Sequence, residues 1–196
     1  GKTSQAIDAQ AVTNFTGTAN EIATIVSSSG VTLDGDFTAT VSNEDGQAYV
    51  DAADIVTIDT ASSGTITATG VTEMRGLADK IVSAATSSEV TIDGDMLFNV
   101  TSGEADVSQI NTLDALTSNV ITAELSDNGA VTLATLKNAN ANNALTITVT
   151  DTEVAASNLS KIDAATTVQV TATAVETLTG TLAAVNSILG AGGVSL

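Results

Sequence analysis

The chain has 196 residues and a formal net charge of −18 at pH 7, from 5 Lys and Arg residues against 23 Asp and Glu residues. It contains no Cys and no His, which excludes disulfide bonds, thiolate chemistry, Ser-His-Asp catalysis and imidazole ligation of zinc. Five scattered cations argue against binding to a nucleic-acid backbone, and no apolar run approaches the ~18 residues of a membrane span, so neither nucleic acid nor membrane insertion is expected.

The apolar side chains are mostly small. Hydrophobic residues make up 43% of the chain, whereas aromatic residues make up 2%. A globular core of this size normally contains several aromatic side chains, each of which buries about 150–250 Å². Their scarcity favours a fold with thin, repeated layers, such as a solenoid.

The first repeated segment is residues 11–33, AVTNFTGTANEIATIVSSSGVTL. It aligns without a gap with residues 174–196, AVETLTGTLAAVNSILGAGGVSL, at an offset of 163. Residues 71–101 match the same segment at an offset of 59. Three related copies in one chain are the signature of a repeat architecture.

Apolar spacing within this segment predicts a helix over 18–26 and another over 181–189. Thr18 is the expected N-cap of the first helix, and Glu21 completes a capping box. A glycine follows each helix and precedes a strand, where a left-handed C-cap is expected, at Gly30 and Gly193.

A second type of segment alternates with the first, at residues 54–69, 109–124 and 158–173. Its apolar residues span a shorter stretch, as in the pairs Ile110 and Leu113, and Leu159 and Ile162, which predicts a single helical turn or a 3₁₀ piece. Each copy places one aspartate after this turn, at Asp59, Asp114 and Asp163. We expect each carboxylate to accept an Asx-type hydrogen bond from the backbone that follows it.

Strand-like stretches alternate β-branched with small or polar residues and begin near residues 31, 65, 90, 119, 144, 168 and 194. After a first gap that carries an acidic insertion, their spacing is about 24–29 residues, the period of a solenoid turn. The sequence therefore predicts an α/β solenoid of stacked parallel β coils with short helices on one side. It is expected to be a single repeat domain over residues 1–196.

The C-terminal segments resemble a repeat of very large marine cyanobacterial surface proteins and of cyanophage structural proteins. The matching features are the LTGT-x-A-x-V-N segment (178–186), the AAS-x-L-x-x-[IL]-D-A element (155–164) and the glycine-rich closure (190–194). The resemblance implies an extended repetitive structure at a cell surface, outside the cell or on a virion. It carries over no catalytic residues.

Acidic residues gather over 34–59, a stretch with no Lys or Arg. Carboxylates and carbonyl oxygens are the ligands that Ca²⁺ prefers, so two Asp-Gly-Asp turns are candidate calcium ligands, at Asp34, Asp36, Asp93 and Asp95. They match neither the EF-hand spacing nor the nonapeptide of calcium-binding β-helices. The alternative is a solvated acidic face with Asp-Gly turns between strands. Ca²⁺ is the only cofactor that these residues suggest.

Two cations lie close to acidic residues in a stretch predicted to be one helix. Lys80 and Arg75 lie near Asp79 and Glu73 and are expected to be surface charges. No motif for a nucleophile or a phosphate loop accompanies them. A glycoside hydrolase is not expected either, because the chain has almost no aromatic residues to stack against sugars.

The chain stops as a strand begins, with no polar capping repeat at either terminus. It is expected to be either a window of a longer repeat array or one subunit of a stacked fibre, with itself or adjacent repeats as partner. The predicted function is structural and non-enzymatic: part of an extracellular fibre, filament or surface layer built by end-to-end stacking. The alternative is a cation-dependent adhesin or phage-fibre binding module.

Overall fold

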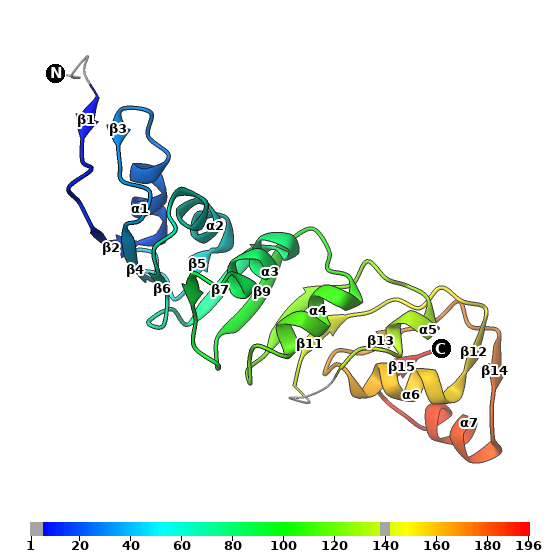
Figure 1. The fold of residues 1–196 in the computed structure, drawn as a ribbon. Coiled ribbons are helices and arrows are strands. Elements are labelled where there is room, and N and C mark those ends of the chain that lie inside the picture. The colour runs from blue at the N-terminus through cyan, green and yellow to red at the C-terminus, as the bar shows by residue number, and fades with distance from the viewer. Residues whose placement is uncertain (1–5, 138–141) are drawn as a thin grey trace. The chain divides into compact units, whose positions relative to one another are not determined.

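The structure is a computed structural model and describes residues 6–137 and 142–196. The chain divides into two compact units, Gly1–Leu97 and Phe98–Leu196. In the described residues the fold is α/β, with seven helices and with parallel strands in several sheets (Figure 1). This confirms the predicted α/β class with parallel strands.

The first unit repeats an order of strand, helix and strand. Its elements are β1 (Ile7–Asp8), β2 (Asn14–Thr18), α1 (Ala19–Val26), β3 (Val31–Thr32), β4 (Thr38–Ser42), β5 (Val50–Asp51), α2 (Ala52–Ala61), β6 (Ile66–Thr67), β7 (Glu73–Leu77), α3 (Ala78–Thr86) and β8 (Val90–Thr91). Strands β2, β4, β6 and β8 form one parallel sheet, while β1 pairs with β3 and β5 pairs with β7.

The second unit has the same kind of elements. They are β9 (Leu97–Ser102), which begins at the last residue of the first unit, α4 (Val107–Asp114), β10 (Ile121–Glu124), α5 (Ala130–Leu133), β11 (Ala144–Thr146), β12 (Glu153–Ala155), α6 (Ala156–Ala164), β13 (Val170–Thr171), β14 (Thr177–Thr179), α7 (Leu182–Leu189) and β15 (Val194–Ser195). Strand β10 pairs with β9 and β11, β12 with β14, and β13 with β15.

The strand pairing has a nearly constant register. In the pair β2–β4, Asn14 lies opposite Thr38, a separation of 24 residues in the sequence. Five other pairs have the same separation between partners: Ile7 and Val31, Val50 and Met74, Ile66 and Val90, Glu153 and Thr177, Val170 and Val194. The separation is slightly longer in β4–β6 and slightly shorter in β9–β10 and β10–β11. Each of these strands therefore pairs with a strand of the next segment along the chain, about 24 residues away.

Alternate strand residues and one face of each helix form the core. In β4, Ala39 and Val41 are buried while the threonines beside them are exposed, as the period of two requires. Helix α1 packs against α2, α2 against α3, and, in the second unit, α6 packs against both α5 and α7. Ala, Val, Ile and Leu side chains make up most of this core, and Phe37 and Phe98 are its buried aromatic residues in the part of the chain that the structure describes.

Several local predictions are confirmed. A strand begins within about two residues of each predicted start, at β3, β6, β8, β10, β11, β13 and β15, and helices α1 and α7 occupy the predicted stretches. The other described strands, among them β2, β4 and β9, were not predicted. The Thr18 side chain accepts a hydrogen bond from the N–H of Glu21, whose carboxylate accepts one from the N–H of Thr18. This is the expected capping box.

The predicted left-handed C-caps are wrong. The C-cap of α1 is Ser27 and that of α7 is Gly190, and both have right-handed dihedral angles. Neither Gly30 nor Gly193 has a positive φ. Gly193 instead lies against the side chain of another segment: a Cβ there would lie 1.8 Å from Oδ1 of Asp163. A larger residue at 193 would therefore require the Asp163 side chain to move.

The prediction of short turns in the second segment type is also wrong. Helices α2, α4 and α6 contain 10, 8 and 9 residues, as many as the helices of the first type. Each has a buried residue one turn before the apolar pair recognised in the sequence, and these residues are Ala52, Val107 and Ala156. Because the buried positions continue at intervals of three, each pattern extends over a full helix.

Candidate functional site

The two Asp-Gly-Asp segments form equivalent turns. Asp34 and Asp36 lie between β3 and β4, and Asp93 and Asp95 lie between β8 and β9. The N–H of Gly35 donates to Oδ1 of Asp34 over 3.0 Å, which is an Asp-stabilised turn. In the described residues, no three acidic side chains lie close enough together to hold a metal ion. The structure thus does not gather the predicted calcium ligands into one site.

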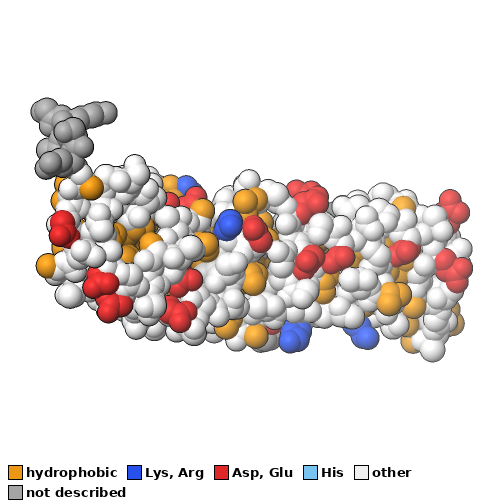
Figure 2. Space-filling view, turned by 45° about the horizontal axis from the view of Figure 1, so that its top comes forward, with side chains coloured by type: hydrophobic (Ala, Val, Ile, Leu, Met, Phe, Trp, Pro, Cys, Tyr) orange, Lys and Arg blue, Asp and Glu red, His pale blue; other side chains and the backbone are white. Residues whose placement is uncertain are grey.

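Acidic side chains are spread over the visible surface rather than gathered in one patch (Figure 2). Several of them cap the helix of the preceding segment. The carboxylate of Glu44 accepts from the N–H of Asn20 over 3.1 Å, and Asp127 accepts from the N–H of Val107 over 2.8 Å. A negative charge at a helix N-terminus satisfies an open N–H and favours the helix dipole. These carboxylates therefore hold successive segments together.

The three aspartates of the second segment type also face a later segment. Oδ1 of Asp59 accepts from the hydroxyl of Ser87 over 2.9 Å, and Oδ1 of Asp114 accepts from the amide of Asn143 over 3.1 Å. Asp163 lies against Gly193. Each partner belongs to the next segment along the chain, so these carboxylates join segments, a contact that the local sequence pattern did not predict.

Asn143 is the centre of a buried polar cluster in the second unit. Its side chain has an exposed fraction of 0%, and that of Asp114 has 3%. The Asn143 amide donates to Asp114 and accepts from the N–H of Ile121 over 3.0 Å. Its backbone carbonyl accepts from the N–H of Thr167 over 2.8 Å. One side chain and its carbonyl thus connect three segments.

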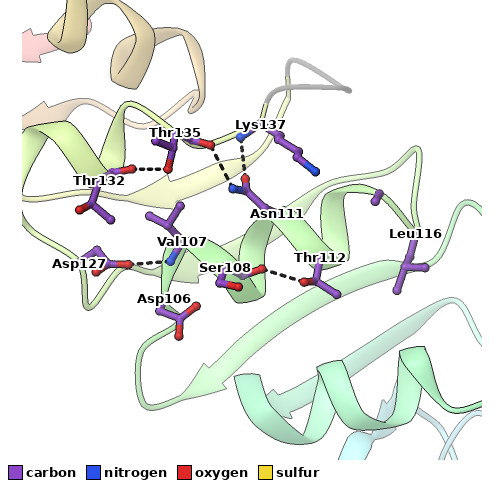
Figure 3. Close-up of a pocket in the computed structure, with 11 residues that line it drawn as sticks. Asp106, Val107, Ser108, Asn111, Thr112, Leu116, Asp127, Thr132, Thr135 and Lys137 are labelled. Atoms are coloured by element: carbon purple, nitrogen blue, oxygen red, sulfur yellow. Dashed lines mark hydrogen bonds between the residues drawn. The ribbon is translucent and has the colours of Figure 1, made fainter.

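An open pocket of about 750 Å³ lies beside the short helix α5, between it and α4. Eight of its lining residues are polar: Asp106, Ser108, Asn111, Thr112, Asp127, Thr132, Thr135 and Lys137. Figure 3 shows these side chains around the hollow. Helix α5 has four residues where the other helices have eight to ten, so it leaves part of α4 uncovered.

The polar groups of this pocket are used mainly to hold the fold. The amide of Asn111 donates to the carbonyl of Thr135 over 3.0 Å and accepts from the N–H of Lys137 over 2.6 Å. Asp106 and Asp127 cap the start of α4. The Lys137 side chain points away from both carboxylates in Figure 3. Sequence reasoning missed the pocket; the signal that could have found it is the stretch 126–150, which neither type of repeated segment covers.

The predicted helix carrying Glu73, Arg75, Asp79 and Lys80 is two elements. Glu73 and Arg75 lie on strand β7, and Asp79 and Lys80 lie on α3. Lys80 and Asp79 form an exposed ion pair at 4.0 Å, as surface charges do. The Arg75 guanidinium lies 3.0 Å from the centre of the Tyr49 ring, a cation–π contact.

Two carboxyl groups have shifted pKa values. Burial raises the pKa of Asp54, a hydrogen bond with Asn20 partly opposes this, and repulsion from Asp51 adds to it. Hydrogen bonds with Ser88 and then Ser87 lower the pKa of Glu89. Neither group lies in the pocket beside α5. The shifts therefore reflect packing within the first unit.

Comparisons of the chain with protein-family models, with curated proteins and with solved structures find no match. Every helix in the described residues is too short or too polar to cross a bilayer. The geometry thus defines a class of arrangement: parallel strand–helix segments in a nearly constant register, joined by carboxylate and amide hydrogen bonds.

Proposed function

We propose that this chain is a structural, non-enzymatic repeat protein whose segments stack as the coils of an α/β solenoid. It would form part of an extracellular fibre, filament or surface layer through end-to-end stacking. The observation that carries the proposal is the register, because six strand pairs share one sequence separation within one chain. A constant step between parallel strands is how a solenoid adds one coil to the next.

The hydrogen bonds between segments support a role in holding a stack together. Carboxylates at Glu44 and Asp127 cap a helix of the preceding segment, and Asp59 and Asp114 reach a later one. These four carboxylates are thus bonded to neighbouring segments of the chain. Such bonds stabilise the stacking of segments. The other acidic side chains give the surface a negative charge, which favours solubility of a long assembly.

Exposed sheet edges support the stacking itself. In the described residues, β14 and β15 each pair on one side, and β2 lies at the edge of its sheet. Edge strands present unpaired backbone N–H and C=O groups, which template the addition of another strand. Further coils of the same kind would satisfy these groups. The extracellular location rests on the resemblance of residues 155–194 to surface-protein repeats.

Negative-stain imaging of the purified chain over a range of concentrations and salt concentrations tests the proposal. We expect elongated particles that lengthen as the protein concentration rises, because each added copy covers an exposed sheet edge. High salt should favour lengthening, since it screens the repulsion between chains of charge −18. Compact particles of constant size under all conditions would refute end-to-end stacking.

A further inference from the structure

The chain contains a single Asn-Gly pair, Asn128 and Gly129, in the segment between β10 and α5. Asparagine is a chemically labile residue, because the backbone nitrogen that follows it can attack its side-chain amide. Glycine in the following position leaves that nitrogen open to approach, since it has no Cβ. Every other asparagine of the chain is followed by a residue that has a Cβ.

The fold leaves both reacting groups of this pair free. Asn128 is exposed and Gly129 is half-buried. In the described residues, neither the side-chain amide of Asn128 nor the N–H of Gly129 makes a hydrogen bond. The bonds that hold the pair use its carbonyl oxygens, which accept from the N–H of Thr150 over 3.1 Å and from the N–H of Leu133 over 3.0 Å. The backbone is thus anchored without occupying the groups that react.

Other asparagines lie where the backbone nitrogen after them is already bonded. After Asn43, the N–H of Glu44 donates to the carbonyl of Tyr49 over 2.9 Å. Asn186 and the residue that follows it lie within α7, where helical hydrogen bonds hold the backbone. A nitrogen that donates such a bond must first break it before it can attack. Sequence and fold therefore single out the same residue, Asn128.

We propose that Asn128 deamidates spontaneously in the folded chain. The Gly129 nitrogen loses its proton and attacks Cγ of Asn128, so that one C–N bond forms and the C–N bond to the side-chain amide nitrogen breaks. That nitrogen takes up a proton and leaves as ammonia, and a five-membered cyclic imide remains. Water then opens the ring at either carbonyl, which gives aspartate or isoaspartate. The net reaction consumes one water and releases one ammonia.

The conformation of Gly129 does not itself require a glycine. Its φ is −83°, which residues with a side chain also adopt, and a Cβ there would lie 4.0 Å from Oδ2 of Asp151, an ordinary contact. The variant Gly129→Ala is therefore expected to fold as the parent does. It differs from the parent at the reacting nitrogen, which makes it a matched control.

Isoaspartate at position 128 would alter the joint between three segments. On one side Asp127 accepts from the N–H of Val107 at the start of α4, and on the other the N–H of Ala130 donates to Asp151 (Figure 3 shows the first bond). Isoaspartate adds one atom to the main chain between these two anchors, and both products add a carboxylate next to Asp127. Helix α5 has only four residues to resist the change. We therefore expect isoaspartate to loosen both anchors.

Incubation of the folded chain at mildly alkaline pH, followed by peptide mapping with mass spectrometry, tests the proposal. The peptide that contains Asn128 should gain about 1 Da, with release of ammonia, and faster than the other asparagine peptides. The rate should rise with pH, because the attacking nitrogen must lose a proton. Gly129→Ala should lower the rate at least about tenfold, since its Cβ hinders the approach. Circular dichroism melting checks that this variant folds.

Two outcomes would overturn the proposal. In the first, Asn128 stays unchanged in the folded chain while it reacts in the guanidinium-unfolded chain, which would mean that the fold protects the pair. In the second, the parent and Gly129→Ala react at equal rates, which would mean that the Gly129 nitrogen is not the attacking group. Neither outcome bears on the proposed function, because the reaction takes place within one chain.

Hydrogen exchange tests the expected effect on the two anchors. The variant Asn128→Asp carries the new charge but keeps the main chain of the parent, so it is the control for the isoaspartate form, which ion-exchange chromatography and peptide mapping identify. The amides of Val107 and Ala130 should exchange faster in the isoaspartate form than in Asn128→Asp. Equal exchange in the two forms would refute the loosening of the joint.

Discussion

Replacing Asn143 tests whether its buried amide connects segments as the geometry indicates. In Asn143→Ala, the N–H of Ile121 loses its acceptor and Asp114 loses the amide donor, both in a buried setting. Each such loss costs about 1–3 kcal/mol, so the variant should lose about 2–6 kcal/mol of unfolding free energy. That is a large part of the ~5–15 kcal/mol typical of a folded protein.

The isosteric variant Asn143→Asp should make the stability depend on pH, which a change in packing alone would not do. It keeps an acceptor for Ile121 but replaces the amide nitrogen, 3.1 Å from Oδ1 of Asp114, with a second carboxylate oxygen. Two carboxylates this close do not both ionise, so the folded variant holds a proton that the unfolded chain has released at pH 7. Its stability should therefore rise as pH falls, by up to about 1.4 kcal/mol per pH unit.

Urea unfolding followed by circular dichroism measures both effects, at pH 7 and at about pH 5, above the isoelectric point of 4.1. The swapped double variant Asp114→Asn/Asn143→Asp restores one amide and one carboxylate and should recover most of the loss. Equal losses for Asn143→Asp at the two pH values would refute the electrostatic reasoning. Unchanged unfolding of Asn143→Ala would refute the role of the cluster.

Two further substitutions test packing and charge in the first unit. A Cβ at Gly64 would lie 2.2 Å from the carbonyl oxygen of Phe37, so Gly64→Ala should lower the unfolding free energy by about 1–3 kcal/mol. The control Gly70→Ala adds a methyl group in open space and should change the unfolding free energy little. Equal urea midpoints for the two variants would contradict this prediction. Burial raises the pKa of Asp54 in the folded protein, so its ionised form lowers stability at pH 7, and Asp54→Asn should raise the urea midpoint there. The gain should shrink as the pH falls toward 3.8, the pKa of the unfolded chain. The control Asp45→Asn removes an exposed charge and should show no such gain, and a similar gain in both variants would contradict a burial effect.

The sequence predicted the elements that depend on local chemistry. The capping box at Thr18 and Glu21 depends on residues three apart, and both of its hydrogen bonds are present. The seven predicted strand starts follow from β-branched alternation next to turns, and a strand begins near each of them, although the other described strands were missed. In each case the deciding interactions lie within one segment, where a single sequence contains all the partners.

Predictions that depended on contacts between segments were incomplete. The apolar pair Ile110 and Leu113 suggested a single helical turn. Val107 extends the same buried face by one more turn, but its burial is seen only in the packed helix. Asp59 was expected to bond to its own backbone, but Ser87 lies 28 residues later in the sequence and next to it in space. No local pattern distinguishes these outcomes, since they depend on which residue the next segment places opposite.

The short helix α5 shows how a defect in a repeat creates a candidate site. Its four residues cannot cover α4 as the longer helices cover their neighbours, so a pocket opens beside it. The amide of Asn111 then bonds to the backbone at Thr135 and Lys137, where the rest of a helix would otherwise pack. These two bonds stabilise the irregular segment, and they use the amide of Asn111, which is therefore already partnered within the fold.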